Sequence, residues 1–127
     1  MLRTGIDLIE ISRFEDMNPE IRQHFLERVF TPAELAYCGD RANHLAGRFA
    51  AKEAVSKALG SGIGSVAWQE IEVLSAPNGE PDLHLHGEAD RLARELGLTE
   101  WSLSITHDRS TAAAVAVAVG PGKENAL

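Results

Sequence analysis

The sequence predicts a mixed α+β fold, in which a mainly antiparallel sheet carries one long helix packed on it. Three observations lead to this prediction. Short β-rich runs open and close the chain, at 5–11 and 111–119. Small apolar residues recur with helical spacing over 43–59, and Asn78-Gly79 separates two strand-like runs as in a hairpin. Strands paired through hairpins, with helices lying on one face, give this class of architecture.

The first third of the chain reads as a strand followed by two helices. GIDLIEI (5–11) is short and β-rich, with Asp7 inside an apolar run. A carboxylate inside a strand is costly unless it is paired, hydrogen-bonded or bound to a metal ion, so Asp7 is a candidate functional residue. The alternative is an ordinary aspartate at a strand end. Apolar residues at three- and four-residue spacing predict helix over 12–29, and Pro19 predicts a break within it.

Two further helices are predicted to follow. Thr31 as N-cap, Pro32 in the first turn and Glu34 at the third position form a near-complete capping box, which marks a helix start. The long helix runs to residue 59 and ends at Gly60, the first residue of the glycine-rich segment GSGIG (60–64). The bare backbone of such a segment can approach a phosphate closely, although known phosphate loops precede a helix rather than follow one.

The second half predicts a hairpin, a helix and two closing strands. The hairpin has strands at 70–75 and 82–86. GEADRLARELGL (87–98) is amphipathic with helical spacing, and Gly97 predicts its C-terminal cap. WSLSITH then pairs with the closing strand across the turn HDRS, so that His107 lies at a hairpin turn. An exposed histidine there can contact an anion or move a proton, or it can have no role.

Length and composition predict one domain. A chain of 127 residues with 44% hydrophobic residues is typical of a single globular domain, which we place at 1–119 with a flexible tail at 120–127. No stretch is apolar enough to span a membrane and the start resembles a strand rather than a leader, so we expect a cytoplasmic protein with no membrane partner. The single cysteine, Cys38, is expected to be a small packed side chain.

Charge is distributed unevenly along the chain. The formal net charge of −7 argues against a general nucleic-acid-binding protein, which needs a broad basic surface. Basic residues nevertheless gather in the first third, at Arg13, Arg22 and Arg28, and again around the long helix. The simplest interpretation of these arginines is solubilising charge, whereas a basic face on an acidic protein favours a selective anionic partner.

The long helix has an unusual second face. Successive side chains about 100° apart place small apolar residues on one half, which we predict to face the core. The other half carries, in angular order, Arg48, Lys52, Ser56, Phe49, Glu53 and Lys57. Glu53 and Lys57 have the spacing of an ordinary surface ion pair, but an aromatic ring between the charges is not typical of a solvated face. If Asp7 and Glu53 converge, they make a Mg²⁺ site together with substrate phosphates.

Four blocks of the sequence, in order, resemble one known family. They are GIDLIEISRF, ERVFTPAEL, LAGRFAAKEAVSKALGSGIG and LSITHDRSTAAAVAV, which together span nearly the whole chain. The sequence resembles the bacterial holo-acyl-carrier-protein synthases, the small class of 4′-phosphopantetheinyl transferases. The resemblance implies transfer of the phosphopantetheine arm of coenzyme A to a serine hydroxyl of apo acyl carrier protein, with release of adenosine 3′,5′-bisphosphate, in fatty acid biosynthesis.

The resemblance also implies roles for individual residues. Asp7 and Glu53 match the Mg²⁺ ligands and Lys57 matches the lysine beside the phosphates, so these three are the predicted catalytic residues. The base for the serine hydroxyl is either Glu53 or a metal-bound water. The residues expected to bind coenzyme A are Arg48, Lys57, Gly60, Ser61, Gly62 and His107. The residues expected to dock the acidic acyl carrier protein are Arg13, Arg22 and Arg28.

The resemblance further implies a homotrimer with its sites at the seams between subunits, and a Phe49 ring that packs against a neighbouring subunit or the ligand. Some positions depart from the family. Ser61 stands where threonine is common, and His24 and Glu80 stand where many members have a basic residue, which makes the docking surface less positive.

Two other functions stay open: a non-catalytic module that binds a carrier protein or nucleotide, and a metal-dependent phosphohydrolase.

Overall fold

The structure, a computed structural model, describes residues 1–60 and 66–123 of the chain. Two of the residues expected to bind coenzyme A, Ser61 and Gly62, lie outside the described residues, as does most of the segment 60–64. No helix within the described part is long and apolar enough to cross a membrane.

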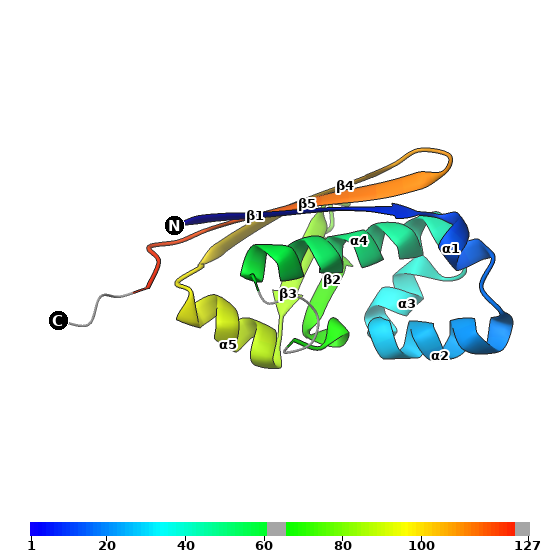
Figure 1. The fold of residues 1–127 in the computed structure, drawn as a ribbon, viewed down its shortest axis with the longest axis horizontal. Helices are drawn as coiled ribbons and strands as arrows, with labels where there is room; N and C mark the ends of the chain where they lie inside the picture. The colour runs from blue at the N-terminus through cyan, green and yellow to red at the C-terminus, as the bar shows by residue number, and fades with distance from the viewer. Residues whose placement is uncertain (61–65, 124–127) are drawn as a thin grey trace.

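A three-stranded antiparallel sheet forms one layer of the molecule. β1 (Leu2–Glu10) and β4 (Glu100–His107) lie at its two edges, and β5 (Thr111–Val119) pairs with both. All helices lie on one side of this sheet, and α4 (Ala42–Leu59) runs along it (Figure 1). The predicted fold class, a mainly antiparallel α+β fold with a long helix on the sheet, is confirmed.

The two faces of the sheet differ sharply. β5 presents a row of small side chains to α4, and these are buried: Ala112, Ala114, Ala116 and Ala118. Because strand side chains alternate, the other face carries the residues between them. That face, which we call the open sheet face, holds large exposed apolar side chains: Leu2, Ile6, Leu8, Val115 and Val119. No element within residues 1–60 and 66–123 covers this face, as Figure 1 shows.

Three short helices follow β1, as the sequence predicts. The predicted break within 12–29 is confirmed, since α1 (Ser12–Glu15) and α2 (Pro19–Val29) are separate helices. α3 (Pro32–Cys38), which ends in the buried free cysteine, begins with the predicted capping box. Thr31 Oγ1 accepts a hydrogen bond from Glu34 N, and Glu34 Oε1 accepts one from Thr31 N at 2.9 Å.

The second face of α4 is not a solvated face, as the aromatic ring among its charges indicates, because most of it is buried. The helices α1 and α3, together with η1 (Trp68–Glu70), cover its second face, and the residues buried there are Arg48, Phe49, Lys52 and Ser56. The Phe49 ring packs within its own chain, with ring centroids 5.8 Å from Phe14, 5.8 Å from Phe25 and 5.0 Å from Trp68. Phe49 is therefore a core residue, because its own chain already occupies the space expected for a neighbouring subunit or ligand.

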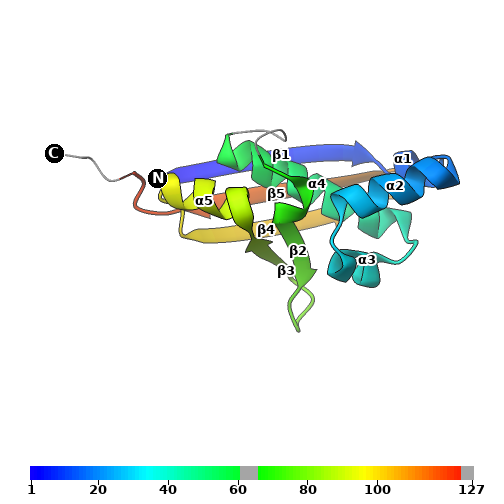
Figure 2. The same cartoon turned by 90° about the horizontal axis from the view of Figure 1, so that it is seen from below.

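The second half of the chain packs beside β4. β2 (Ile71–Ser75) and β3 (Pro81–Leu85) form the predicted hairpin, and Gly79 in its turn has a φ of +91° that favours glycine. Figure 2 shows this hairpin beneath the β4 edge of the sheet. α5 (Gly87–Glu95) is shorter than predicted and ends just before Gly97, whose φ is +71°.

The two ends of the described chain meet at one end of the sheet. The Met1 amino group donates to Gly120 O at 2.6 Å, and Gly120 N donates to Met1 O at 3.1 Å. Gly122 N donates to Gly97 O at 3.2 Å. The expected tail, 120–127, is thus hydrogen-bonded at its start, while residues 124–127 lie outside the described part.

Candidate active site

β1 places Asp7 at the edge of the sheet, on the side that faces α4. Because alternate residues of a strand share a face, Asp7 lies on the same side as Gly5 and Ile9, which are both buried. The Asp7 side chain itself is 18% exposed. An edge position lets this carboxylate reach solvent while its backbone stays in the ladder, opposite Ala114.

α4 adds a lysine and a second carboxylate to the same edge. Lys57 Nζ donates to Ile6 O at 2.9 Å and to Asp7 Oδ1 at 3.2 Å, and its side chain is 53% exposed. No ion pair joins Lys57 to Glu53 within residues 1–60 and 66–123, so the interpretation as an ordinary surface pair one turn apart is not supported. The lysine instead ties the helix to the strand.

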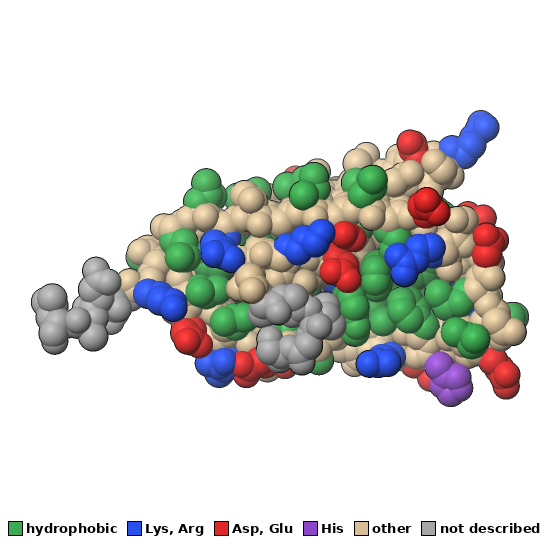
Figure 3. Space-filling view, in the orientation of Figure 1, with side chains coloured by type: hydrophobic (Ala, Val, Ile, Leu, Met, Phe, Trp, Pro, Cys, Tyr) green, Lys and Arg blue, Asp and Glu red, His purple; other side chains and the backbone are tan. Residues whose placement is uncertain are grey.

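Glu53 lies in an electrostatically unfavourable position. Burial raises the pKa of its carboxyl group above the ordinary value, and the negative charge of Asp7 raises it further. The positive charges of Lys57 and Arg13 oppose this shift of the Glu53 pKa. The two carboxylates therefore repel one another. Figure 3 shows acidic side chains adjoining one another near the middle of one face of the molecule, between basic ones. A cation placed between the two carboxylates relieves the repulsion.

The donor set at this edge fits Mg²⁺ better than a metal with many protein ligands. No group of three or more histidine, cysteine, aspartate or glutamate side chains in the described part of the chain is arranged to hold a metal ion. Mg²⁺ is usually held by one or two carboxylates together with waters and substrate phosphates. Asp7 and Glu53 match that pattern, whereas a structural zinc site needs four protein ligands.

A second cluster of the predicted residues lies at the opposite edge of the sheet. Arg48 is only 7% exposed, and its Nη2 donates to Ser75 Oγ at 2.7 Å while its guanidinium lies 4.6 Å from the centroid of the Tyr37 ring. Its Nε has no hydrogen-bond partner in the structure. Arg48 lines a pocket of about 160 Å³, together with His107 and His44.

The second cluster is electropositive. Burial lowers the pKa of His44, and the nearby positive charges of Arg41, Arg48 and His107 lower it further. A buried guanidinium with one unpartnered N–H, in a pocket that disfavours another proton, is arranged to receive an anionic group. Arg48 is thus buried in a pocket, and the role in coenzyme A binding that the resemblance implies for it stays a prediction.

One chain does not bring the two clusters together. Asp7 lies on β1 and His107 on β4, and β5 runs between these strands, so that two strand spacings, about 10 Å, separate the edges. Gly60 ends α4 beside the first cluster, with a φ of +77° and its N–H bonded to Lys57 O. The described members of the predicted coenzyme A set are thus divided between the β1 edge, with Lys57 and Gly60, and the β4 edge, with Arg48 and His107.

The three predicted docking arginines behave differently from one another. Arg13 and Arg28 are exposed. Arg22 instead helps to hold α1 and α2 together, because its Nε donates to Phe14 O at 3.1 Å and its Nη1 lies 3.4 Å from Asp40 Oδ1. Ile21 on α2 exposes an apolar side chain close by in sequence, so this part of the surface combines positive charge with apolar area, as Figure 3 shows.

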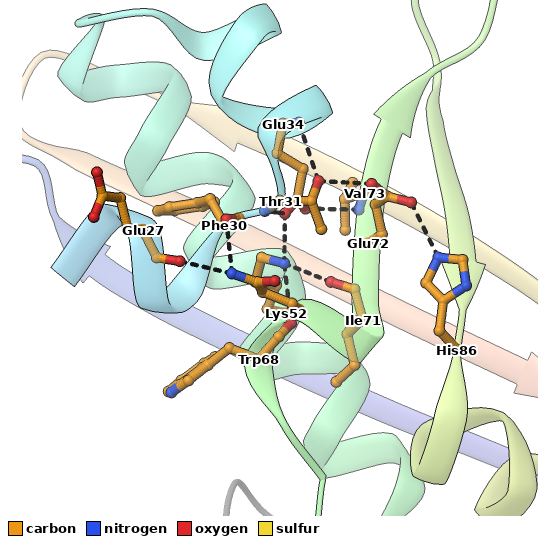
Figure 4. A network of polar contacts seen from close by, with 11 residues as sticks. Glu27, Phe30, Thr31, Glu34, Lys52, Trp68, Ile71, Glu72, Val73 and His86 are labelled. Atoms are coloured by element: carbon orange, nitrogen blue, oxygen red, sulfur yellow. Dashed lines mark hydrogen bonds and ion pairs between the residues drawn. The ribbon is translucent and has the colours of Figure 1, made fainter. Parts of the chain in front are cut away.

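Sequence reasoning missed a buried ion pair next to the site. Lys52 Nζ lies 2.8 Å from Glu34 Oε1, and both side chains are fully buried. The same ammonium donates to Trp68 O at 3.1 Å and Ile71 O at 2.6 Å, while Glu34 Oε2 accepts from Val73 N at 2.8 Å (Figure 4). The capping box identifies Glu34 by its neighbours three residues away, but no local signal identifies a partner 18 positions along the chain.

Comparison with known proteins agrees with the resemblance. Residues 3–118 match the family described as the 4′-phosphopantetheinyl transferase superfamily. A holo-[acyl-carrier-protein] synthase of Moorella thermoacetica is 52% identical over 122 residues, covering 92% of this chain and 93% of that protein. The Helicobacter pylori holo-[acyl-carrier-protein] synthase in complex with coenzyme A has a TM-score of 0.82 at 36% identity, with 91% of this chain and 99% of that one covered.

A further solved structure, an ACPS–CoA complex of Chronobacterium ammoniagenes, has a TM-score of 0.80 at 34% identity and covers 94% of this chain and 98% of that one. The family match spans most of the chain, and the relatives are similar over their full length rather than over one motif. This chain belongs to the 4′-phosphopantetheinyl transferase superfamily, among the holo-acyl-carrier-protein synthases.

Proposed function

We propose that this chain transfers the 4′-phosphopantetheine arm of coenzyme A to a serine hydroxyl of apo acyl carrier protein. The products are holo acyl carrier protein and adenosine 3′,5′-bisphosphate, and the reaction serves fatty acid biosynthesis. The observation that carries this proposal is the convergence of Asp7, Glu53 and Lys57 at the β1 edge, in a chain whose relatives are named for this reaction. We place the enzyme in the cytoplasm.

Asp7 and Glu53 hold Mg²⁺ in this proposal. When bound, the ion supplies positive charge that neutralises phosphate oxygens and stabilises the leaving phosphate. The mutual repulsion of the two carboxylates, which raises the Glu53 pKa, is the feature of this chain that favours the ion. With only two protein ligands, most of the coordination sphere is left to water and substrate.

Lys57 acts beside the carboxylates on the leaving group. Breaking the pyrophosphate linkage leaves negative charge on adenosine 3′,5′-bisphosphate, and an ammonium aimed at that charge stabilises the transition state. The contacts of Lys57 Nζ with Ile6 O and Asp7 Oδ1 hold its ammonium at the strand edge. Its half-exposed side chain still leaves donor capacity for a phosphate oxygen.

Glu53 is the group of this chain best suited to accept the proton of the serine hydroxyl. A carboxylate with a raised pKa is a stronger base than an ordinary one, and the pKa of Glu53 is raised by burial and by Asp7. Asp7 is less suited because Lys57 already donates to its Oδ1. A bound cation lowers this pKa again, so in this proposal Glu53 holds the ion and the base is either Glu53 or a water bound at the site.

The complete site needs a second copy of the chain. Coenzyme A is proposed to bind Lys57 and the segment Gly60, Ser61 and Gly62 of one subunit together with Arg48 and His107 of the next. Two features support this. Of the described residues in this set, Lys57 and Gly60 lie at one sheet edge while Arg48 and His107 lie at the other. The open sheet face exposes more apolar side chains than a solitary domain normally leaves uncovered. Three copies joined through the sheet give the homotrimer that we propose.

Acyl carrier protein docks on the α1–α2 surface beside the carboxylates. Arg13 and Arg28 offer exposed positive charge to an acidic partner, and Arg22 offers part of its guanidinium. Such contacts steer association and are screened by salt. The rate of transfer at limiting carrier protein is therefore expected to fall as ionic strength rises.

Intact-mass spectrometry of apo acyl carrier protein tests the proposal. Wild-type protein with coenzyme A and Mg²⁺ is expected to add the mass of one phosphopantetheine arm. Glu53→Gln is expected to lower the rate about 10²–10⁴-fold, as loss of a catalytic base does, whereas the matched control Glu95→Gln on the exposed face of α5 keeps the wild-type rate.

Other outcomes separate the alternatives. Binding of the carrier protein without any mass gain indicates a non-catalytic module, and hydrolysis of coenzyme A in the absence of carrier protein indicates a phosphohydrolase. An equal rate for Glu53→Gln and Glu95→Gln contradicts the assigned site.

A further inference from the structure

The backbones of β1 and α4 touch at Gly5. A Cβ atom at this position would overlap the carbonyl oxygen of Ala54, and it would lie 2.8 Å from Ala54 C and 3.0 Å from Ala58 N. These are backbone atoms of the helix, so no side chain can rotate away to make room. Gly5 does not have a positive φ, so glycine is required here for space and not for an unusual backbone conformation.

The contact lies among the residues of the proposed site. Asp7 is two residues further along β1 on the same face as Gly5, because strand side chains alternate. Glu53 and Lys57 immediately precede Ala54 and Ala58, the two helix residues that Gly5 faces. The closest approach of strand and helix is therefore flanked by both carboxylates and the lysine.

Two hydrogen bonds also join β1 to α4 near Gly5. Arg3 Nε donates to Ala58 O at 2.8 Å, and Lys57 Nζ donates to Ile6 O at 2.9 Å. Both join a side chain of one element to the backbone of the other, on either side of Gly5 in the strand sequence. The distance between strand and helix is thus fixed by contacts at Arg3, Gly5 and Ile6 of the strand. It is shortest at Gly5.

We propose that Gly5 is a positioning residue for the metal site: by letting β1 and α4 touch, it sets the distance between the Asp7 and Glu53 carboxylates. The inference rests on the proposed function, in which these two groups share one divalent cation. Mg²⁺ requires near-ideal geometry, with oxygen ligands at about 2.0–2.1 Å. An alanine at position 5 must separate the backbones by about 1 Å, a displacement that is enough to impair a catalytic arrangement about 10²-fold.

The test compares Gly5→Ala with Gly120→Ala, a matched change at the end of the sheet where the two chain ends meet. A Cβ at Gly120 would overlap Gly97 O, so this change also forces two backbone segments apart, but away from the proposed site. Mn²⁺ binding to the protein saturated with coenzyme A is measured by electron paramagnetic resonance of the free ion. Transfer rate is measured against Mg²⁺ concentration, and thermal unfolding is recorded in chelator.

Gly5→Ala is expected to raise the Mn²⁺ dissociation constant and the half-saturating Mg²⁺ concentration at least about 10-fold. Gly120→Ala is expected to keep both values, whatever its effect on the unfolding temperature. A purely structural role for Gly5 predicts a lower unfolding temperature with an unchanged Mn²⁺ dissociation constant, and that result in folded protein overturns the inference.

If Gly5→Ala does not fold, Arg3→Met decides the question. This change removes the Arg3 hydrogen bond to Ala58 O without placing any atom between strand and helix. A raised Mn²⁺ dissociation constant supports the inference, and a wild-type constant overturns it. Failure of the proposed function looks different, because wild-type protein and Glu53→Gln then bind Mn²⁺ equally.

Discussion

Two lysines five residues apart on α4 have opposite surroundings. Lys52 is fully buried against Glu34, with two backbone carbonyls completing its contacts, and Glu34 in turn accepts from two backbone N–H groups. Lys57 is half exposed and contacts one carboxylate of a pair that carries an excess of negative charge. The buried Lys52–Glu34 pair, which we call the closed pair, has no hydrogen-bonding capacity left for a ligand. The Lys57–Asp7 pair, which we call the open pair, still has such capacity. In the proposed function, similar residues on one helix therefore serve structure in one case and catalysis in the other.

The largest expected effect is on stability at the closed pair. Lys52→Met leaves the Glu34 carboxylate buried without its partner, which costs about 3–5 kcal/mol of unfolding free energy. Lys57→Met removes a half-exposed contact and costs less than about 1 kcal/mol. Urea unfolding of both variants in chelator measures the difference. Equal losses would show that the two pairs do not differ in the way their burial implies.

The next effect is on activity at the open pair. Lys57→Met is expected to lower the transfer rate about 10²–10³-fold, because it removes a positive charge that stabilises the leaving phosphate. Arg94→Met on α5, which removes an exposed positive charge paired with Asp90, serves as the control and is expected to keep the rate. Single-turnover transfer to apo acyl carrier protein measures the chemical step. A Lys57→Met enzyme as fast as Arg94→Met would remove Lys57 from the site.

The smallest expected effect is on the metal-free protein at the Glu53 carboxyl. Its folded-state pKa is raised, so the folded protein binds a proton more tightly than the unfolded chain does. Stability in chelator therefore falls as pH rises from the ordinary glutamate pKa through the raised one. The free energy of unfolding of Glu53→Gln does not fall in this way. The variant is therefore expected to be more stable than wild type at neutral pH, by less than about 1 kcal/mol.

Thermal unfolding in chelator, from about pH 4 to about pH 8, measures this difference. The variant and the wild type are expected to converge at the acidic end. A Glu53→Gln protein that is less stable than wild type at neutral pH without metal would contradict the proposed repulsion between Glu53 and Asp7.

The same contrast explains what the sequence can and cannot predict. The spacing of apolar residues and the capping residues of helices are local signals. They predict the strands, the break before α2 and the end of α4 close to where the structure has them. The angular order of the side chains around α4 predicts which residues share a face. Which segments cover each face depends on residues far away in the sequence. The sequence therefore does not show that Trp68 and Glu34 enclose Phe49 and Lys52, and the Phe49 ring was expected instead to meet a neighbouring subunit or the ligand.

The proposed site was predictable only in part, for a related reason. Residue types and the family resemblance identify Asp7, Glu53 and Lys57, but spacing in the sequence cannot show that a strand at residue 7 meets a helix at residue 53. The meeting depends on the absent side chain of Gly5, whose importance is visible only against the backbone of Ala54. Arg48 was identified by resemblance, and its burial in a pocket with Tyr37 was not foreseen.

If copies of the chain join through the open sheet face, as proposed, the stability of the protein depends on its concentration. A lone chain leaves Leu2, Ile6, Leu8, Val115 and Val119 in water, and burying such a surface against other copies stabilises the folded chain by mass action. The unfolding temperature should therefore rise with protein concentration. On this proposal, a newly synthesised chain stays prone to nonspecific aggregation until it assembles with other copies. Its stability in a cell then depends on the rate at which the chain is synthesised.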